Sequence, residues 1–201
     1  TENRLIGPAR NVWNPVCTAG GSSGGSAVAV AAGMTPIAQG SDGGGSIRIP
    51  ASLSGVYGIK ATQGRVPRKL VDEHSYSIFN NSSVGPMTRD VADAAIFLNV
   101  LSGPAEEAEY GTLPNSPPDF TSALTRGVSG LRVGLETTGM GGAGCDRQIR
   151  DSVVSAARVF EELGAHVEEV EYAPDEHEEI FRTFMDMFCI RAYGRWSGQL
   201  H

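Results

Sequence analysis

The chain has 201 residues, of which 40% are hydrophobic and 19% charged, with 16 Lys and Arg against 23 Asp and Glu. This is the composition of a soluble globular protein, and the length suffices for one sizeable α/β core. The formal net charge of −7 argues against a nucleic-acid partner or an anionic membrane surface, because both attract clustered Lys and Arg.

Three widely spaced cysteines, Cys17, Cys145 and Cys189, form no Cys-x-x-Cys motif. An odd number at such spacing predicts neither a disulfide framework nor a zinc site and is typical of a reducing compartment. No apolar run is long enough for a membrane span, and no signal peptide is visible. We therefore expect a cytoplasmic protein with no membrane partner. Because the chain begins at Thr1 without an initiator Met, we expect it to be part of a longer polypeptide.

The first predicted elements fall in residues 20–50, which are rich in glycine and serine. Residues 25–33 are small and apolar, and this predicts a buried helix. Residues 35–40 form a short apolar run that predicts a buried strand, and residues 46–54 predict a short helix. The N-terminus of that second helix would direct its backbone N–H groups and the positive end of its dipole at Ser46.

The middle of the chain predicts one strand and one well-bounded helix. Residues 55–84 are consistent with a strand followed by a long surface loop. Thr88 is expected to cap a helix that stops at Gly103, with acidic residues in its first turn. Residues 103–128 are rich in proline, serine and acidic residues and predict a connector.

A strand-helix-strand unit is predicted next, from a strand at 131–135, a helix at 146–163 and a strand at 167–170. Such a unit implies parallel strands covered by helices. Residues 178–196 predict a final amphipathic helix. Its inward face is expected to carry Ile180, Phe184, Met187 and Phe188.

Two glycine-serine clusters are the candidates for chemistry. Ser22 and Ser23 lie between pairs of glycines, and Ser46 directly follows three glycines. Glycine at this density predicts backbone conformations closed to other residues, or close approach to a ligand. A hydroxyl directly after three glycines lies beside backbone N–H groups, which is what an oxyanion site requires. We therefore expect a serine nucleophile here.

Two other motifs match only formally. Residues 21–25 fit the Gly-x-Ser-x-Gly nucleophile elbow, with His166 and His177 as bases, but the preceding residues make a poor strand. Residues 139–144 fit Gly-x-Gly-x-x-Gly, yet three residues separate them from the strand and the acidic residues downstream lie on a helix. A surface loop is the favoured interpretation of that second motif.

Residues 20–62, GGSSGGSAVAVAAGMTPIAQGSDGGGSIRIPASLSGVYGIKAT, closely resemble the amidase signature family. GRVPR at 64–68, GPMTRDVADAA at 85–95 and ELGAHV at 162–167 also look like this family, so the resemblance covers most of the chain. It implies an α/β fold with a mixed sheet covered by helices on both faces, incomplete here. It also implies that residues 1–201 are the central part of one larger domain.

The resemblance implies a Ser–Ser–Lys site. Ser46 matches the acylated nucleophile, and Ser22 matches the middle serine that follows a non-proline cis peptide and relays protons. The remaining positions match an oxyanion hole at Gly43, Gly44, Gly45 and Ser46, and supporting polar groups at Ser23, Asp42 and Arg48. In such a site a neutral lysine takes a proton through the middle serine while the nucleophile attacks the amide carbonyl.

The chain departs from this pattern at the lysine. No lysine precedes Lys60, which matches a structural position of the family, so the base is expected outside this chain. The resemblance thus predicts an amidase-type hydrolase of carboxylic amides with no metal or cofactor, inactive as residues 1–201 alone. A homodimer, or a partner chain that supplies the missing segments, is the expected protein partner. Alternatives are a glutamine-hydrolysing subunit of a tRNA-dependent amidotransferase and a non-catalytic anion-binding module.

Overall fold

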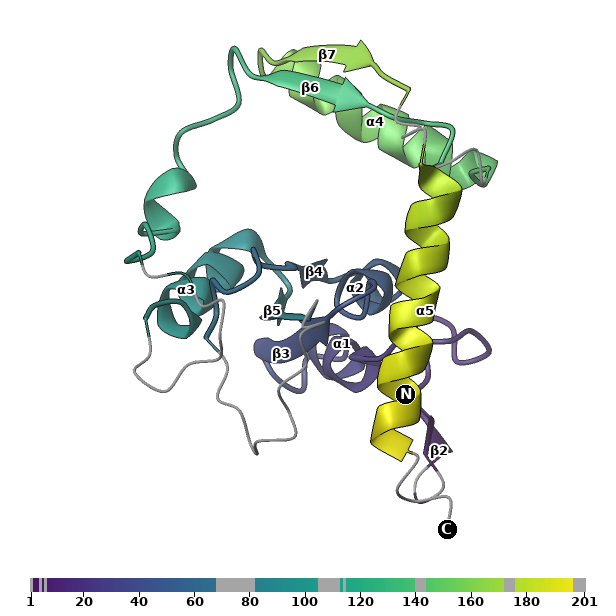
Figure 1. The fold of residues 1–201 in the computed structure, drawn as a ribbon. Helices are drawn as coiled ribbons and strands as arrows, with labels where there is room; N and C mark the ends of the chain where they lie inside the picture. The colour runs from purple at the N-terminus through teal and green to yellow at the C-terminus, as the bar shows by residue number, and fades with distance from the viewer. Residues whose placement is uncertain are drawn as a thin grey trace. The chain divides into compact units, whose positions relative to one another are not determined.

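The computed structural model describes residues 2–3, 5, 7–67, 82–104, 113, 115–139, 144–171 and 176–196. The chain divides into two compact units, Thr1–Thr125 and Arg126–His201 (Figure 1). That both units belong to one larger domain stays a prediction.

The first unit is built on a small antiparallel sheet with the strand order β3-β5-β4. Its elements in chain order are β1 (Glu2–Asn3), β2 (Gly7–Pro8), α1 (Gly24–Ala31), β3 (Ile37–Asp42), α2 (Arg48–Ser54), β4 (Tyr57–Gly58), β5 (Ser83–Thr88), α3 (Val91–Leu101) and the 3-10 helix η2 (Thr121–Ala123). The predicted helices at 25–33 and 46–54 and the strand at 35–40 are confirmed as α1, α2 and β3, within a few residues at their ends.

The sequence pattern does not predict the central strand β5. All six of its residues are buried, so it lacks the alternation of a half-exposed strand, and Pro86 in its middle argues against a strand. The carbonyl of Pro86 nevertheless accepts from the Ile59 amide at 3.1 Å. Thr88 is the last residue of β5 and therefore not a helix cap. That prediction is wrong, because Asp90 caps α3 by accepting from the Asp93 amide at 2.9 Å.

Two small apolar clusters hold the first unit together. One joins α1, α2 and β5 through Ala27, Ile47, Ala51 and Met87. The other packs α3 against β5 and the segment after β4, through Ala61, Val66, Val84 and Leu98. Burial of a large side chain such as Ile47 or Met87 stabilises by about 1.5–3 kcal/mol, so these clusters fix α2 against the sheet. Ser46, two residues before α2, therefore lies next to a fixed helix.

The second unit contains the predicted strand-helix-strand motif. Its elements are β6 (Arg132–Leu135), α4 (Arg147–Glu162), β7 (His166–Glu169) and α5 (His177–Trp196). The two strands are parallel, with Val133 opposite Val167, as expected. Asp146 caps α4 by accepting from the Gln148 amide at 2.8 Å.

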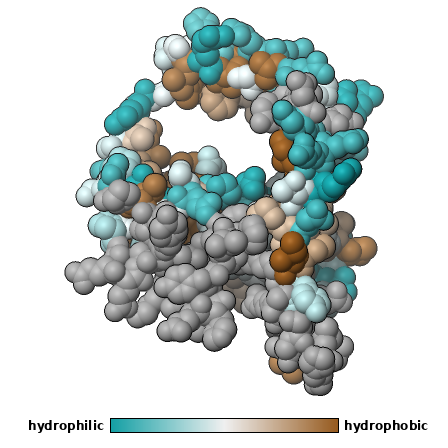
Figure 2. Space-filling view, viewed as in Figure 1, coloured by the Kyte–Doolittle hydropathy of each residue, from teal (hydrophilic) through white to brown (hydrophobic). Residues whose placement is uncertain are grey.

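Apolar side chains are exposed on the helices of the second unit. Figure 2 shows brown, apolar atoms over the part that contains β6, β7 and α4. On α4 and directly after it these include Ile149 and Leu163, which are 59% and 60% exposed. The prediction of an inward face on α5 is wrong for Ile180 and Phe188, which are 56% and 61% exposed. None of the helices in the described part of the chain combines the length and apolar character that crossing a membrane requires.

Candidate active site

The turn between β3 and α2 is organised by a buried carboxylate. Asp42, the last residue of β3, is fully buried, and its Oδ1 accepts from the Gly45 amide at 2.6 Å. Its Oδ2 accepts from the amides of Ile47 and Arg48 at 3.2 and 3.3 Å. The Arg48 guanidinium completes the set, with Nε 2.9 Å from Oδ2 and Nη2 3.0 Å from Oδ1. One carboxylate thus fixes both the glycine turn and the start of α2.

The same contacts set the charge state of Asp42. Burial by itself would raise the pKa of this carboxyl group, but hydrogen bonds from Arg48 and from the amides of Gly45 and Ile47 together lower the pKa far below its usual value. In return, the hydrogen bond to Asp42 raises the pKa of Arg48. Asp42 is therefore an anion at neutral pH. Its contacts hold the turn between β3 and α2.

These bonds change the predicted role of the helix N-terminus. The amides of Ile47 and Arg48 donate to Asp42 and not toward the Ser46 side chain, so the expected dipole site at Ser46 is not formed. Gly45 also donates its amide to Asp42, which removes it from the donors available to a ligand. In the described part of the chain, the amides of Gly44 and Ser46 make no hydrogen bond. The N–H groups of Gly44 and Ser46, both in the turn between β3 and α2, are thus without a partner among the described residues.

The first serine cluster meets this turn directly. The peptide bond between Gly21 and Ser22 is cis, as the resemblance implies. The Ser23 amide donates to the Ser46 carbonyl at 3.1 Å. The Ser23 hydroxyl accepts from the Ser41 amide at 3.2 Å and donates to the Ser41 carbonyl at 3.4 Å. Two serine clusters that are far apart in the sequence are therefore brought together, with Ser23 joining them to the end of β3.

Gly40 makes this close approach possible. A Cβ atom at Gly40 would lie 2.8 Å from Ile47 Cγ1 and 3.0 Å from Ser23 Oγ. Both distances are shorter than ordinary van der Waals contact, so any side chain here would push α2 or Ser23 out of place. Gly40 is a structural member of the site that the sequence motifs did not single out. The signal available was its position two residues before Asp42.

The segment before Ser22 is a second feature that the sequence analysis missed. Asn11 is buried, and its Nδ2 donates to the Leu53 carbonyl at 2.6 Å. The indole Nε1 of Trp13 donates to the Ser54 carbonyl at 2.8 Å. These donors hold the C-terminal end of α2, while Ser23 contacts Ser46 just before its start. The asparagines and proline of residues 11–15 predict a turn, but nothing local indicates a partner 42 residues away.

Comparison with known proteins decides the family. A family model described as Amidase matches residues 1–197. The chain belongs to the amidase signature family. Its recognition from the two serine clusters, and the mixed α/β fold that follows from it, are confirmed.

Relatives in the amidase signature family include components of amidotransferases. The chain is 45% identical over 172 residues to a glutamyl-tRNA(Gln) amidotransferase subunit of Rubrobacter xylanophilus, covering 85% of this chain and 34% of that protein. The corresponding subunit of Lactiplantibacillus plantarum is 44% identical over 170 residues, covering 85% and 34%. The chain thus spans about a third of the length of these curated relatives.

Solved structures of the amidase signature family include both amidases and an amidotransferase component. The structure of a bacterial aryl acylamidase matches with a TM-score of 0.86 at 39% identity, over 99% of this chain and 40% of that one. The glutamyl-tRNA(Gln) amidotransferase subunit of Thermotoga maritima gives 0.77 at 34% identity, over 98% and 41%. Substrate class therefore differs among proteins that share this amidase signature fold.

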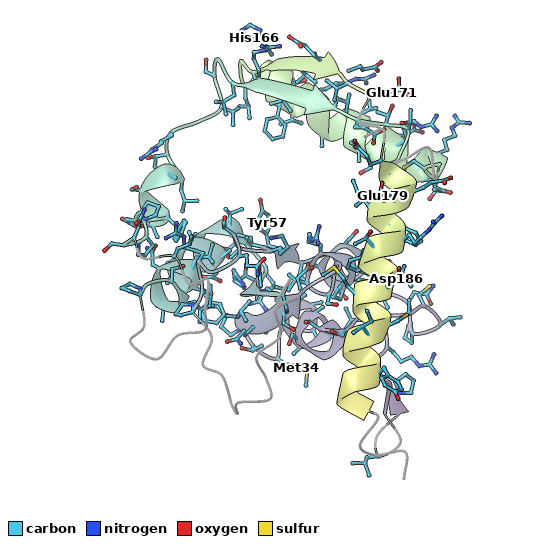
Figure 3. All side chains as sticks on the ribbon, viewed as in Figure 1. Met34, Tyr57, His166, Glu171, Glu179 and Asp186 are labelled. Atoms are coloured by element: carbon cyan, nitrogen blue, oxygen red, sulfur yellow. The ribbon has the colours of Figure 1, made fainter. Side chains whose placement is uncertain are left out.

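The remaining candidates from the sequence are the residues of the hydrolase elbow and its two histidine bases. His166 and His177 belong to the second unit, and His166 is exposed at the start of β7 (Figure 3). No strand directly precedes residues 21–25. The described residues 10–20 contribute only an isolated bridge between Arg10 and Thr18, so the hydrolase elbow is not formed.

The lysines and the second glycine motif add nothing further. Lys60 is exposed, and its Nζ donates to the neighbouring Ala61 carbonyl at 3.0 Å. Lys69, His74, His201 and residues 140–143 lie outside the described residues.

Proposed function

We propose that the polypeptide containing this chain is an amidase that hydrolyses carbon–nitrogen bonds of carboxylic amides through an acyl-enzyme on Ser46. The observation that carries the proposal is the meeting of the two serine clusters. Ser23 contacts Ser46 through a 3.1 Å backbone hydrogen bond, directly after the cis peptide at Ser22. A serine proton relay requires a second hydroxyl group near the nucleophile, and we assign this role to Ser22, the residue before Ser23.

In the proposed reaction, the Ser46 Oγ attacks the amide carbonyl carbon and its proton passes to the Ser22 hydroxyl. Ser22 passes its own proton to a neutral lysine, which we place outside residues 1–201. The carbonyl oxygen becomes an oxyanion, for which Gly44 and Ser46 supply amide N–H groups that have no partner among the described residues. The carbon–nitrogen bond then breaks as the proton returns to the leaving nitrogen. Water, deprotonated along the same relay, hydrolyses the Ser46 ester.

The supporting residues have separate tasks in this proposal. Asp42 and Arg48 keep the turn in one conformation, so the N–H groups of Gly44 and Ser46 are oriented before substrate binds. Gly43 begins the turn, and Gly45 completes it at a φ of +112°, a conformation that side chains rarely adopt. Removing one oxyanion donor in a serine hydrolase costs about 10²–10³ in kcat. The substrate is a small amide, and the proposal includes no metal, cofactor, membrane or direct nucleic-acid contact.

A glutamine-hydrolysing amidotransferase component is the second candidate, and the identity of 45% to such a protein favours it. Substrate assays on the full polypeptide distinguish the two. Our proposal expects the polypeptide alone to hydrolyse an aryl amide such as an acyl anilide. Ammonia release from glutamine that appears only with partner subunits, without anilide hydrolysis, would favour the amidotransferase instead.

The isolated chain gives a further test. Because the proposed base lies outside it, residues 1–201 alone should show no amide turnover and no labelling of Ser46 by a fluorophosphonate. Turnover by residues 1–201 would refute the placement of the lysine. A full polypeptide in which Ser46 is never acylated, while sulfate binding is lost on Gly44→Ala, would instead support the anion-binding alternative.

A further inference from the structure

Residues 11–23 contact helix α2 at its C-terminal end and along its side, and they reach Ser46, two residues before its start. We propose that Asn11 is a positioning residue that acts through α2 and sets the place of Ser22 relative to Ser46. This inference rests on the proposed function, since it assigns Asn11 to the same serine pair. It is carried by contacts at both ends of α2 and along its side.

The contacts at the C-terminal end join side chains to helix carbonyls. The last carbonyls of a helix lack partners within the helix and need donors from elsewhere. Asn11 supplies Nδ2 to Leu53 at 2.6 Å, and Trp13 supplies its indole N–H to Ser54 at 2.8 Å. Asn11 is only 7% exposed, so water cannot easily replace its donor.

Further contacts lie along the side of α2 and beyond its N-terminal end. A Cβ at Gly20 would lie 2.9 Å from Leu53 Cδ1 and 3.0 Å from Pro50 Cα, so Gly20 lies directly against the side of α2. Three residues later, the Ser23 amide reaches the Ser46 carbonyl at 3.1 Å. The segment is therefore bound to α2 at each end, and a shift at Asn11 is transmitted to Ser22.

The chemistry of the asparagine side chain makes the role testable. Its Oδ1 accepts from the amides of Trp13 and Asn14 at 2.9 and 3.3 Å, which folds the local turn. Its Nδ2 attaches that turn to α2. Asn11→Asp keeps the acceptor and removes the donor, because a carboxylate cannot donate at neutral pH. The variant thus leaves the turn formed and removes one of its two hydrogen bonds to the C-terminal end of α2, while the Trp13 indole still donates to Ser54.

Asn14→Asp is the matched control. Asn14 lies in the same turn and is exposed, and its Oδ1 accepts from the Val16 amide at 3.1 Å. Aspartate preserves that bond and introduces the same charge, without touching α2. Trp13→Phe is a second, milder variant. It removes one donor from a side chain that is 72% exposed, so the loss of packing is small.

The experiment uses the full polypeptide and a fluorophosphonate that reacts with activated serines. The rate constant of Ser46 labelling and the final stoichiometry are measured separately by intact mass, alongside kcat and KM for an aryl amide. Misplacing catalytic groups by about 1 Å costs about 10²-fold, so a fractional shift in Asn11→Asp should slow labelling and lower kcat by about 10-fold. Stoichiometry and KM should stay near the parent values. Trp13→Phe should lose roughly 2- to 10-fold, and Asn14→Asp less than about 2-fold.

The outcomes separate three cases. Slower labelling at full stoichiometry in Asn11→Asp, with Asn14→Asp unchanged, supports the positioning role. A normal rate at reduced stoichiometry means that Asn11 only stabilises the fold, and it overturns the inference, as does a normal rate at full stoichiometry. If the unmodified polypeptide is not labelled at Ser46 at all, the proposed function fails and the inference falls with it.

Discussion

Asp42→Asn replaces one oxygen of the carboxylate that holds the turn between β3 and α2 with an NH2 group. The resulting loss in unfolding free energy can be worked from the structure. Asp42 is fully buried and accepts five hydrogen bonds, three from the amides of Gly45, Ile47 and Arg48 and two from the Arg48 guanidinium. Asparagine can accept through one oxygen only, so its NH2 group would face the donors now bound to Oδ2. Two of these are backbone amides, and each buried unsatisfied donor costs about 1–3 kcal/mol. We expect the free energy of unfolding to fall by about 2–6 kcal/mol.

Arg48→Ala should cost less than Asp42→Asn. The Arg48 side chain is 55% exposed, and ion pairs of exposed groups contribute at most about 1 kcal/mol. Urea unfolding of the full polypeptide measures both losses. Asp119→Asn is an exposed control, because the bonds from Asn99 and Thr121 all reach Oδ1, and asparagine keeps one such acceptor oxygen. Asp42→Asn should also abolish most Ser46 labelling. Equal stability of Asp42→Asn and the Asp119→Asn control would refute the claim that the carboxylate organises the turn.

Three further predictions concern the same unit. Since the folded-state pKa of Asp42 is lowered, its contribution to stability is present above the unfolded pKa of about 3.9 and is lost as pH falls toward the folded pKa. The difference in unfolding free energy between the parent and Asp42→Asn should therefore be constant from about pH 7 to 5 and shrink below about pH 4. A difference that grows on acidification would contradict this sign. Gly40→Ala should disrupt the site, because its Cβ would lie 2.8 Å from Ile47. Gly25→Ala, whose Cβ would have nothing within 4 Å, should be neutral or stabilise by up to about 1 kcal/mol. Thermal melts followed by circular dichroism check both variants, and equal melting points would count against this prediction. Asp90→Ala should remove the cap of α3 at a cost of about 1 kcal/mol, measured by the same melts, and an unchanged melt would show that the cap bond contributes nothing.

The helices and strand β3 could be predicted because their signals are local. The small apolar run of α1, the helix α4 and the parallel pair β6 and β7 all follow from the pattern of apolar residues along the chain. Strand β5 could not be predicted, since a strand buried on both faces and interrupted by Pro86 has no alternation. Tertiary contacts with β3 and β4 decide its structure.

The sequence predicts those residues of the candidate site that belong to the strict glycine-serine motif. The resemblance identified Ser22, Ser46 and the glycine turn, and the cis peptide and the Ser23–Ser46 contact agree with it. The hydrogen bonds of Asp42 and Asn11 were not predictable. The amide of Gly45 could as well have faced a ligand, and only the folded turn shows that Asp42 occupies it. Asn11 and its partner Leu53 are 42 residues apart, beyond any local pattern.

Mapping the labelled residue tests directly whether Ser46 forms the acyl-enzyme and whether Ser22 relays its proton. The full polypeptide is treated with a fluorophosphonate, digested, and mapped by mass spectrometry, together with its Ser46→Ala and Ser22→Ala variants. We expect one adduct, on Ser46, that is absent in Ser46→Ala and forms far more slowly in Ser22→Ala. An adduct on another residue, or labelling that persists unchanged in Ser46→Ala, would contradict it.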